Sequence, residues 1–219
     1  MKSQHSYSET DKAAVYKAIA ERRDMRHFSP EPLEKGLLNR LLSVANQAPS
    51  VGLMQPWRFV RITDNTLKLS IKSLVETERN ITADLLDQRK SEFLKLKVEG
   101  ILDCSELIIV ALPEGREKHV FGRRTMPDMD LASVSCAIQN MWLAARAEGI
   151  GLGWVSLFDP IALASLLNMP KDSRPIAILC IGHVEKFYEK PMLVEQNWCQ
   201  PKEIEQFLFE NTWPEETNV

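Results

Sequence analysis

Three arginine side chains cluster near the start of the chain. Arg22, Arg23 and Arg26 lie within five residues of one another, and Asp24 stands between them. Guanidinium groups bind phosphate oxygens through paired hydrogen bonds, so this cluster suits a phosphate monoester carrying about two negative charges. If a helix expected over residues 9–22 continues to residue 26, Arg22 and Arg26 share one of its faces. The alternative is structural: arginines in a last helical turn stabilise the helix dipole, with Asp24 as a solvated ion-pair partner.

A second candidate site is the segment 48–57, which reads APSVGLMQPW. It combines apolar side chains with the hydroxyl of Ser50 and the amide of Gln55, and Gly52 makes the chain pliable between them. Apolar residues with a few hydrogen-bonding groups are typical of a site for a planar heterocycle. A connector between a helix and a strand that packs under the core is the alternative.

Glycines alternate in the segment Gly149–Gly153, and Ser156 follows it. In a dinucleotide-binding fingerprint the glycines follow a strand and open a helix, whereas these follow a helix and open a strand. We therefore reject that fingerprint and expect a helix to end at Gly149, with a strand at Gly153 that a ligand can approach closely. No G-x-S-x-G motif surrounds Ser156, which argues against serine-hydrolase chemistry.

The elements that must position these residues are both helices and strands. Periodicity predicts helices over 9–22, 33–44, most of 64–100 with a break near residue 80, 131–148 and 161–167. It predicts strands over 57–62, 106–112, 151–157 and 175–181. This order predicts an α+β (α/β layered) fold in one domain spanning residues 1–219. The helix over 131–148 is apolar on nearly all sides, which is typical of the centre of a fold or of a large subunit interface.

The composition bounds the class of protein. With 219 residues, 44% hydrophobic and 26% charged, the chain has the composition of a globular protein with a sizeable core. Its net charge of −3 argues against nucleic acid or an anionic membrane as partner. We expect no signal peptide and a cytoplasmic location, because the first twenty residues are polar. The four cysteines lie far apart, which argues against a metal site and fits reduced thiols.

Taken together, three motifs resemble the FMN-binding nitroreductase superfamily: R-R-x-x-R-x-F at 22–28, P-S-x-x-x-x-Q-P-W at 49–57 and G-x-G-W-V-S at 151–156. Within it, Asp24, Gly52 and the block 122–127 resemble the 5,6-dimethylbenzimidazole synthase (BluB) family. Ordinary nitroreductases usually have serine where Asp24 stands. The resemblance extends from about Tyr16 to Ile181.

This resemblance implies a nitroreductase-like fold with a central mixed sheet flanked by helices, in an intertwined homodimer. One FMN site per subunit lies at the interface, and the tail over about 184–219 packs on the partner. The arginines hold the phosphate and ribityl chain, while Ser50 and Gln55 face the flavin of the partner subunit. The full set of implied flavin contacts is Arg22, Arg23, Asp24, Met25, Arg26, Ser50, Gly52, Gln55, Lys97, Gly153 and Ser156.

The implied reaction consumes the flavin. Reduced FMN and O2 give 5,6-dimethylbenzimidazole, the lower ligand of cobalamin, and erythrose 4-phosphate, with NAD(P)H acting only through a separate flavin reductase. A carboxylate at Asp24 supplies acid–base chemistry that a serine cannot, and Ser156 is implied as a hydrogen-bond partner. Segments 94–100 and 125–127 are candidates for a lid that excludes water. Lys97 in the first of them reaches the flavin or, as the alternative, lies on a solvated helix face.

Two other functions remain open at this point. The first is a conventional nitroreductase or flavin reductase that takes hydride from NAD(P)H, against which Asp24 and Gly52 weigh. The second is a flavin-binding protein without turnover, in which Asp24 would have no chemical role.

Overall fold

The computed structural model, which describes residues 5–214, is built around a four-stranded sheet with strand order β1-β2-β4-β3. The strands are β1 (Arg58–Ile62), β2 (Glu106–Leu112), β3 (Gly151–Val155) and β4 (Arg174–Gly182), and all neighbours pair antiparallel. A single parallel bridge joins Asp24 to Leu152 of β3. The expected α+β fold is therefore confirmed, and the mixed character of the sheet among the described residues is confined to that bridge.

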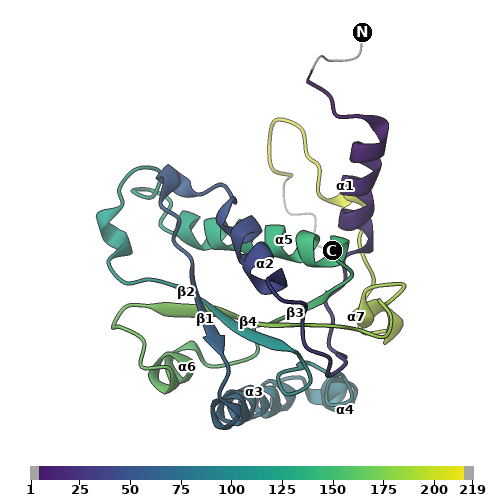
Figure 1. Ribbon diagram of the computed structural model, residues 1–219, viewed down its shortest axis with the longest axis vertical. Coiled ribbons are helices and arrows are strands. Elements are labelled where there is room, and N and C mark those ends of the chain that lie inside the picture. Colours follow the sequence, from purple (N-terminus) through teal and green to yellow (C-terminus); the bar gives the residue numbers. More distant parts are fainter. Residues whose placement is uncertain (1–4, 215–219) are drawn as a thin grey trace.

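Helices cover both faces of this sheet (Figure 1). On one face lie α2 (Leu37–Asn46) and α5 (Met129–Ala147), and on the other lie α3 (Asn65–Asp84) and α6 (Pro160–Leu166). Successive residues of a strand point to opposite faces, so β2, which is buried on both faces from Leu107 to Leu112, is apolar over those residues. Ile108, Val110 and Leu112 pack in the cluster with α2 and α5, whereas Leu107 and Ile109 pack in the cluster with α3 and α6.

Helix α5 buries one face within this chain. Val134, Ile138 and Met141 are fully buried against α2 and the sheet. Cys136 and Ala132, on another side of the helix, are exposed. The helix therefore forms part of the core, and an interface role for its exposed small residues stays a prediction.

The helix α1 (Glu9–Glu21) ends before the arginine cluster begins, so Arg22 and Arg26 do not share a helical face. Ser8 caps its start by accepting a hydrogen bond from the Asp11 amide, and Arg22 already has extended dihedrals (φ −59°, ψ 131°). The prediction that Arg22 and Arg26 lie on one helical face is wrong. The helix-dipole alternative is also wrong, because no basic residue occupies the last turn of α1. The reason is tertiary: the chain must be extended here to pair with β3.

Two other boundaries differ from the sequence prediction. Helix α2 begins at Leu37 rather than residue 33, because Gly36 precedes it with left-handed dihedrals (φ 86°). The break expected near Asn80 falls after Asp84, where α3 ends before the short helix α4 (Lys90–Phe93). Asn80 is exposed, and one residue of low helix propensity costs only a few tenths of a kcal/mol, too little to stop a helix whose Val75 and Ala83 are buried.

The long loop over 114–128 is held by a buried carboxylate. Asp130, only 2% exposed, accepts from Arg116 and Arg123, each at 2.9 Å. The loop packs on segment 50–55, since a Cβ at Gly52 would lie 3.1 Å from the Phe121 ring. Gly122, the first residue of the block 122–127, also packs on that segment, since a Cβ there would lie 2.5 Å from Val51 Cγ2. Within residues 5–214, no helix is both long and apolar enough to cross a membrane.

Candidate active site

Residues 22–26, the arginine segment, cross the free edge of β3 and are fixed to it by backbone contacts. The Met25 amide donates to the Leu152 carbonyl at 3.0 Å. A Cβ at Gly153 would overlap the Met25 carbonyl oxygen and lie 2.7 Å from Arg26 Nη1, so only glycine fits there. The Met25 side chain is itself buried at 1% exposure. The structure thus gives Met25 and Gly153 a structural role, joining the segment to the sheet, and the group that approaches Gly153 is the chain's own backbone.

Asp24 is held in place by Arg26 and Trp154. Arg26 Nη1 and Nη2 donate to the two carboxylate oxygens at 2.5 and 2.7 Å, and the Trp154 amide donates to Oδ1 at 2.9 Å. Arg26 also donates to the Trp154 carbonyl at 2.8 Å and to the Met25 carbonyl at 3.1 Å. Both terminal nitrogens of its guanidinium are thus engaged within the chain. Arg26 therefore orients the Asp24 carboxylate, and its predicted contact with the phosphate stays a prediction.

Arg22 and Arg23 retain capacity for an anion. The Arg22 guanidinium lies 4.5 Å from the centroid of the Trp142 ring, and burial is the main cause that lowers its pKa, which favours an anionic neighbour. Arg23 donates to the carbonyls of Ala20, Arg22 and Glu189, yet its Nε is buried without a hydrogen-bond partner in the described chain. A buried donor without an acceptor is costly, so these two arginines fit a phosphate group.

These residues open onto a cavity of about 620 Å³. Its polar lining includes Arg22, Arg23, Asp24, Arg26, Lys97 and Ser156. Its apolar lining comes from segments 93–98, 154–157 and 191–201. The volume lies within the range of about 300–1,000 Å³ usual for small-molecule sites, and an apolar wall with a few polar groups is the usual composition.

Asp24, Trp154 and Ser156 also line a second cavity, of about 670 Å³. They therefore stand where the two cavities meet. Ser156 follows the end of β3 and is exposed, and its Oγ makes no hydrogen bond with any residue in 5–214. The Asp24 carboxylate, 43% exposed, can still accept a hydrogen bond at Oδ2 from a molecule in either cavity, since only Arg26 donates to that oxygen.

The structure does not bring Ser50, Gly52 and Gln55 to these cavities. Ser50 Oγ accepts from the Gln55 amide at 3.0 Å, and the neighbouring Val51 amide donates to Ser133 Oγ of α5 at 3.0 Å. None of the three lines either cavity in this chain. Their assignment to the flavin of a partner subunit stays a prediction.

Lys97 does line the first cavity, and it lies beyond the end of α4 rather than on a helix. Its ammonium pairs with Asp103 at 2.6 Å. The alternative that placed it on a solvated helix face is therefore wrong. Helix α4 ends at Phe93, and Lys97 lies four residues farther along, outside regular secondary structure.

Sequence reasoning missed the contribution of the C-terminal region to this cavity. Trp198 packs on Phe93 at 6.0 Å between centroids, and the Arg89 guanidinium lies 3.6 Å from its ring centroid. Upstream, the Tyr188 hydroxyl accepts from the Arg26 amide at 3.2 Å. Residues 188–201 of the tail assigned to the partner thus pack on their own chain. These residues lie near residues 154–157 in space but far from them in the sequence, so no sequence pattern could have shown this contact.

Comparison with known proteins identifies the family. The model of the nitroreductase family matches residues 19–183. The chain is 37% identical over 179 residues to a 5,6-dimethylbenzimidazole synthase of Rhodospirillum rubrum, covering 81% of this chain and 85% of that one. It is 34% identical over 195 residues to one of Rhodobacter capsulatus, covering 88% and 94%.

A solved structure agrees in fold. Iodotyrosine deiodinase bound to FMN and 3-iodo-L-tyrosine superposes with a TM-score of 0.69 at 22% identity, covering 91% of this chain and 100% of that one. The two proteins thus share a fold, and the neighbour binds FMN. The chain belongs to the nitroreductase family of oxidoreductases, in the group of the 5,6-dimethylbenzimidazole synthases.

Proposed function

We propose that this protein converts reduced FMN and O2 into 5,6-dimethylbenzimidazole and erythrose 4-phosphate. The observation that carries the proposal is the Asp24 carboxylate, fixed by Arg26 and Trp154 where two cavities meet beside the arginine segment. The activity named for the relatives at 37% and 34% identity supports it.

The substrate phosphate would bind at Arg22 and Arg23. Burial of the Arg22 guanidinium and the unpaired Arg23 Nε both favour an anion. Lys97, whose present partner Asp103 is 49% exposed, can exchange that carboxylate for the phosphate or ribityl hydroxyls at little cost, since exposed ion pairs are weak.

The Asp24 carboxylate transfers the protons that ring cleavage requires. Its Oδ1 already accepts from Arg26 and Trp154, whereas Oδ2 accepts only from Arg26, so Oδ2 is the oxygen that exchanges a proton with the substrate. Ser156, with no hydrogen bond to the described residues, donates or accepts one at the same end of the cavity. Apolar residues of the wall, among them Leu96, Leu157 and Trp198, exclude water from the reacting ring.

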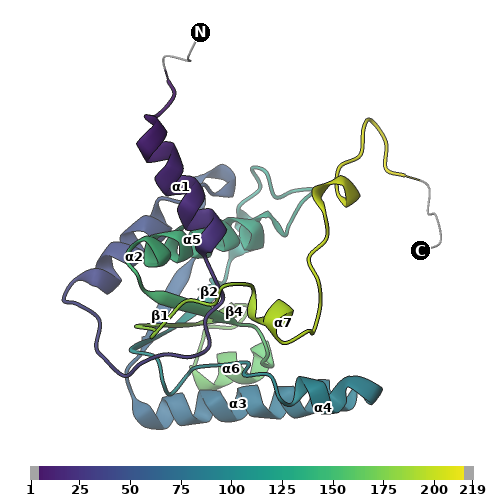
Figure 2. The same ribbon diagram turned by 90° about the vertical axis from the view of Figure 1, so that its right-hand side faces the viewer.

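A homodimer would complete the site. The motif residues Ser50 and Gln55 lie outside this chain's cavities, and α5 presents exposed small residues. The C-terminal segment leaves the body beyond α7 (Met192–Glu195), with Phe207 and Trp213 60% and 82% exposed (Figure 2). Apolar side chains in such number at a surface are typical of a protein–protein interface.

The test is an assay of product against flavin. The purified chain is mixed with FMN, NADH, a separate flavin reductase and air, and the mixture is examined by mass spectrometry. The proposal expects 5,6-dimethylbenzimidazole to appear at the expense of FMN, and only when the reductase is present. Steady NADH oxidation by the chain alone with FMN intact would instead identify a nitroreductase or flavin reductase.

A further inference from the structure

One wall of the 620 Å³ cavity has no regular secondary structure to hold it. Phe93, Leu96, Lys97 and Val98 line the cavity, yet α4 ends at Phe93 and no helix or strand follows until β2 begins at Glu106. We call residues 94–98 the wall segment. Because it forms no helix or strand, its backbone carbonyls need hydrogen-bond donors from elsewhere in the chain.

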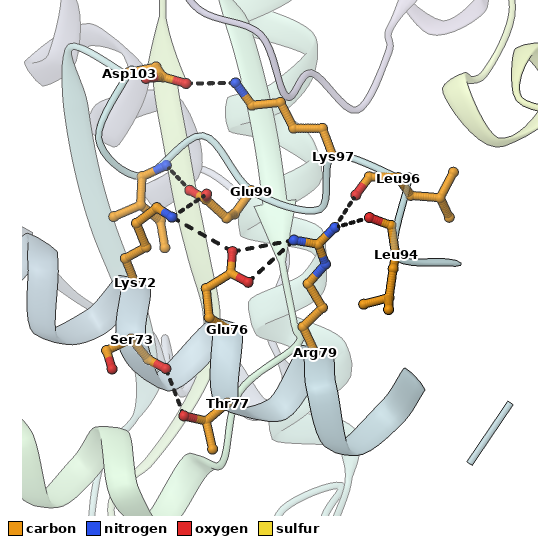
Figure 3. Close-up of polar contacts among 11 residues, drawn as sticks. Lys72, Ser73, Glu76, Thr77, Arg79, Leu94, Leu96, Lys97, Glu99 and Asp103 are labelled. Carbon is orange, nitrogen blue, oxygen red and sulfur yellow. Dashed lines mark hydrogen bonds and ion pairs between the residues drawn. The ribbon is translucent and has the colours of Figure 1, made fainter. Parts of the chain in front are cut away.

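Arg79 of α3 supplies those donors (Figure 3). Its Nη2 donates to the Leu94 carbonyl at 2.6 Å and to the Leu96 carbonyl at 3.1 Å. Its Nη1 donates to the two carboxylate oxygens of Glu76 at 3.5 and 3.3 Å. The side chain is 19% exposed, and the carboxylate on one side and two carbonyls on the other require the planar fork of a guanidinium.

The contacts continue along the same segment behind the wall. Glu76 lies 3.7 Å from Lys72, and Lys72 lies 3.6 Å from Glu99, which is largely buried. Glu99 in turn accepts from the Ile101 amide at 2.6 Å. The four charges of Lys72, Glu76, Arg79 and Glu99 balance, and none of these side chains lines the cavity. The network therefore supports the wall without facing the substrate.

We propose that Arg79 is a positioning residue for the flavin site, an inference that rests on the proposed function. By holding the carbonyls on either side of Lys95, it fixes Leu96 and Lys97 at the cavity. If the wall loosens, water enters and the reduced flavin reacts with O2 in the simpler way: two electrons and two protons pass from the flavin to O2, giving oxidised FMN and hydrogen peroxide.

The test compares Arg79→Lys with wild type. An ammonium cannot reach Glu76 and both carbonyls in the same geometry, so we expect FMN binding about three- to tenfold weaker. We also expect a larger share of the consumed O2 to appear as hydrogen peroxide rather than dimethylbenzimidazole. Hydrogen exchange at the amides of residues 94–98 should become faster. Glu76→Gln, which keeps the shape of the side chain and weakens its hold on Arg79, should change all three in the same direction by less.

Two controls separate positioning from stability. Ile71→Val lowers stability from within the core of the same helix without touching the network, and Arg61→Lys makes the same chemical change in the surface pair with Glu106. Neither should alter the ratio of peroxide to product. The inference is overturned if Arg79→Lys binds FMN with wild-type affinity and leaves exchange at residues 94–98 unchanged. Neither of those two measurements depends on product formation. A wild-type protein that makes no dimethylbenzimidazole would overturn the proposed function, and the role of Arg79 would still be tested by FMN affinity and hydrogen exchange.

Discussion

At the scale of single residues, the site depends on how the chain's own donors are distributed among its acceptors. Both terminal nitrogens of Arg26 donate to Asp24 and to two carbonyls, so Arg26 orients the carboxylate. Arg22 stacks on Trp142 and the buried Nε of Arg23 has no partner in the described chain, so these are the two arginines that we expect to hold a phosphate. The motif R-R-x-x-R thus contains two different kinds of arginine, which residue type and spacing cannot distinguish.

Replacing Asp24 by asparagine keeps the shape of the side chain and removes its ability to take up a proton. We expect dimethylbenzimidazole formation to fall about 10²- to 10⁴-fold, the usual contribution of a general acid or base, with FMN still bound. Ser156→Ala, which removes one hydrogen-bonding group, should cost about five- to tenfold. Single-turnover assays with reduced FMN measure both. Wild-type rates in both variants would show that these residues do not act in the reaction.

The lowered pKa of His27 predicts that the stability of the fold depends on pH. Burial, followed by the nearby positive charge of Lys97, lowers the pKa of His27, whose Nδ1 lies 2.7 Å from the Tyr188 hydroxyl. The unfolded chain binds the proton near the ordinary value of about 6.5, and the folded chain binds it only at lower pH. Between the two pKa values the unfolded state holds more protons, so stability falls as pH drops below about 6.5.

We therefore expect urea midpoints to decrease between pH 7 and pH 5, and this decrease to be smaller in His27→Asn, which keeps a hydrogen-bonding group in place of Nδ1. Equal slopes in the two proteins would show that His27 does not contribute to the pH dependence.

At the scale of elements, the arginine segment adds to the edge of β3 rather than continuing α1. The bridge between Asp24 and Leu152 and the absence of a side chain at Gly153 make this possible. Because the segment contributes Asp24 and three arginines to the cavity, the packing at Gly153 decides where these charged groups lie.

Gly153→Ala should therefore destabilise the protein by about 1–3 kcal/mol, because the new methyl group overlaps the Met25 backbone, which cannot rotate away. FMN binding should weaken as well, since Asp24 and Arg26 must shift. Urea denaturation and fluorescence titration measure the two effects. Gly149→Asn is the matched control: nothing lies within 4 Å of its Cβ and asparagine tolerates its φ of 74°, so it should cost less than about 1 kcal/mol. Similar losses in both variants would contradict this account.

At the scale of the whole molecule, one chain holds a cavity and a substantial apolar surface. Exposed apolar residues lie on α1, where Val15 and Ile19 are each 50% exposed and no residue is buried, and on the C-terminal segment around Phe207 and Trp213. The core itself is complete, with buried clusters on both faces of the sheet. These surfaces are therefore available to a second copy of the chain.

We expect light scattering to give a mass twice the 25.0 kDa of one chain at micromolar concentration. Removing residues 204–219 takes away the exposed apolar side chains of the tail and should shift the equilibrium toward the monomer. Ile161→Ser, on α6 at the opposite face of the sheet, is the control and should leave the mass unchanged. A monomeric intact chain would contradict the homodimer.

The strands, most helices, the layered fold and the family could be predicted from the chain alone, because periodicity and short motifs are local properties. The bounds predicted for β2 match the structure at both ends. Three features became visible only in the folded chain: Arg26 pairs with Asp24 and Trp154, residues 191–201 line the same cavity as residues 93–98, and Arg79 binds the carbonyls of residues 94 and 96. The physical reason is that a donor's partner is whichever acceptor the fold brings within about 3 Å, and these acceptors lie up to 128 residues away along the chain.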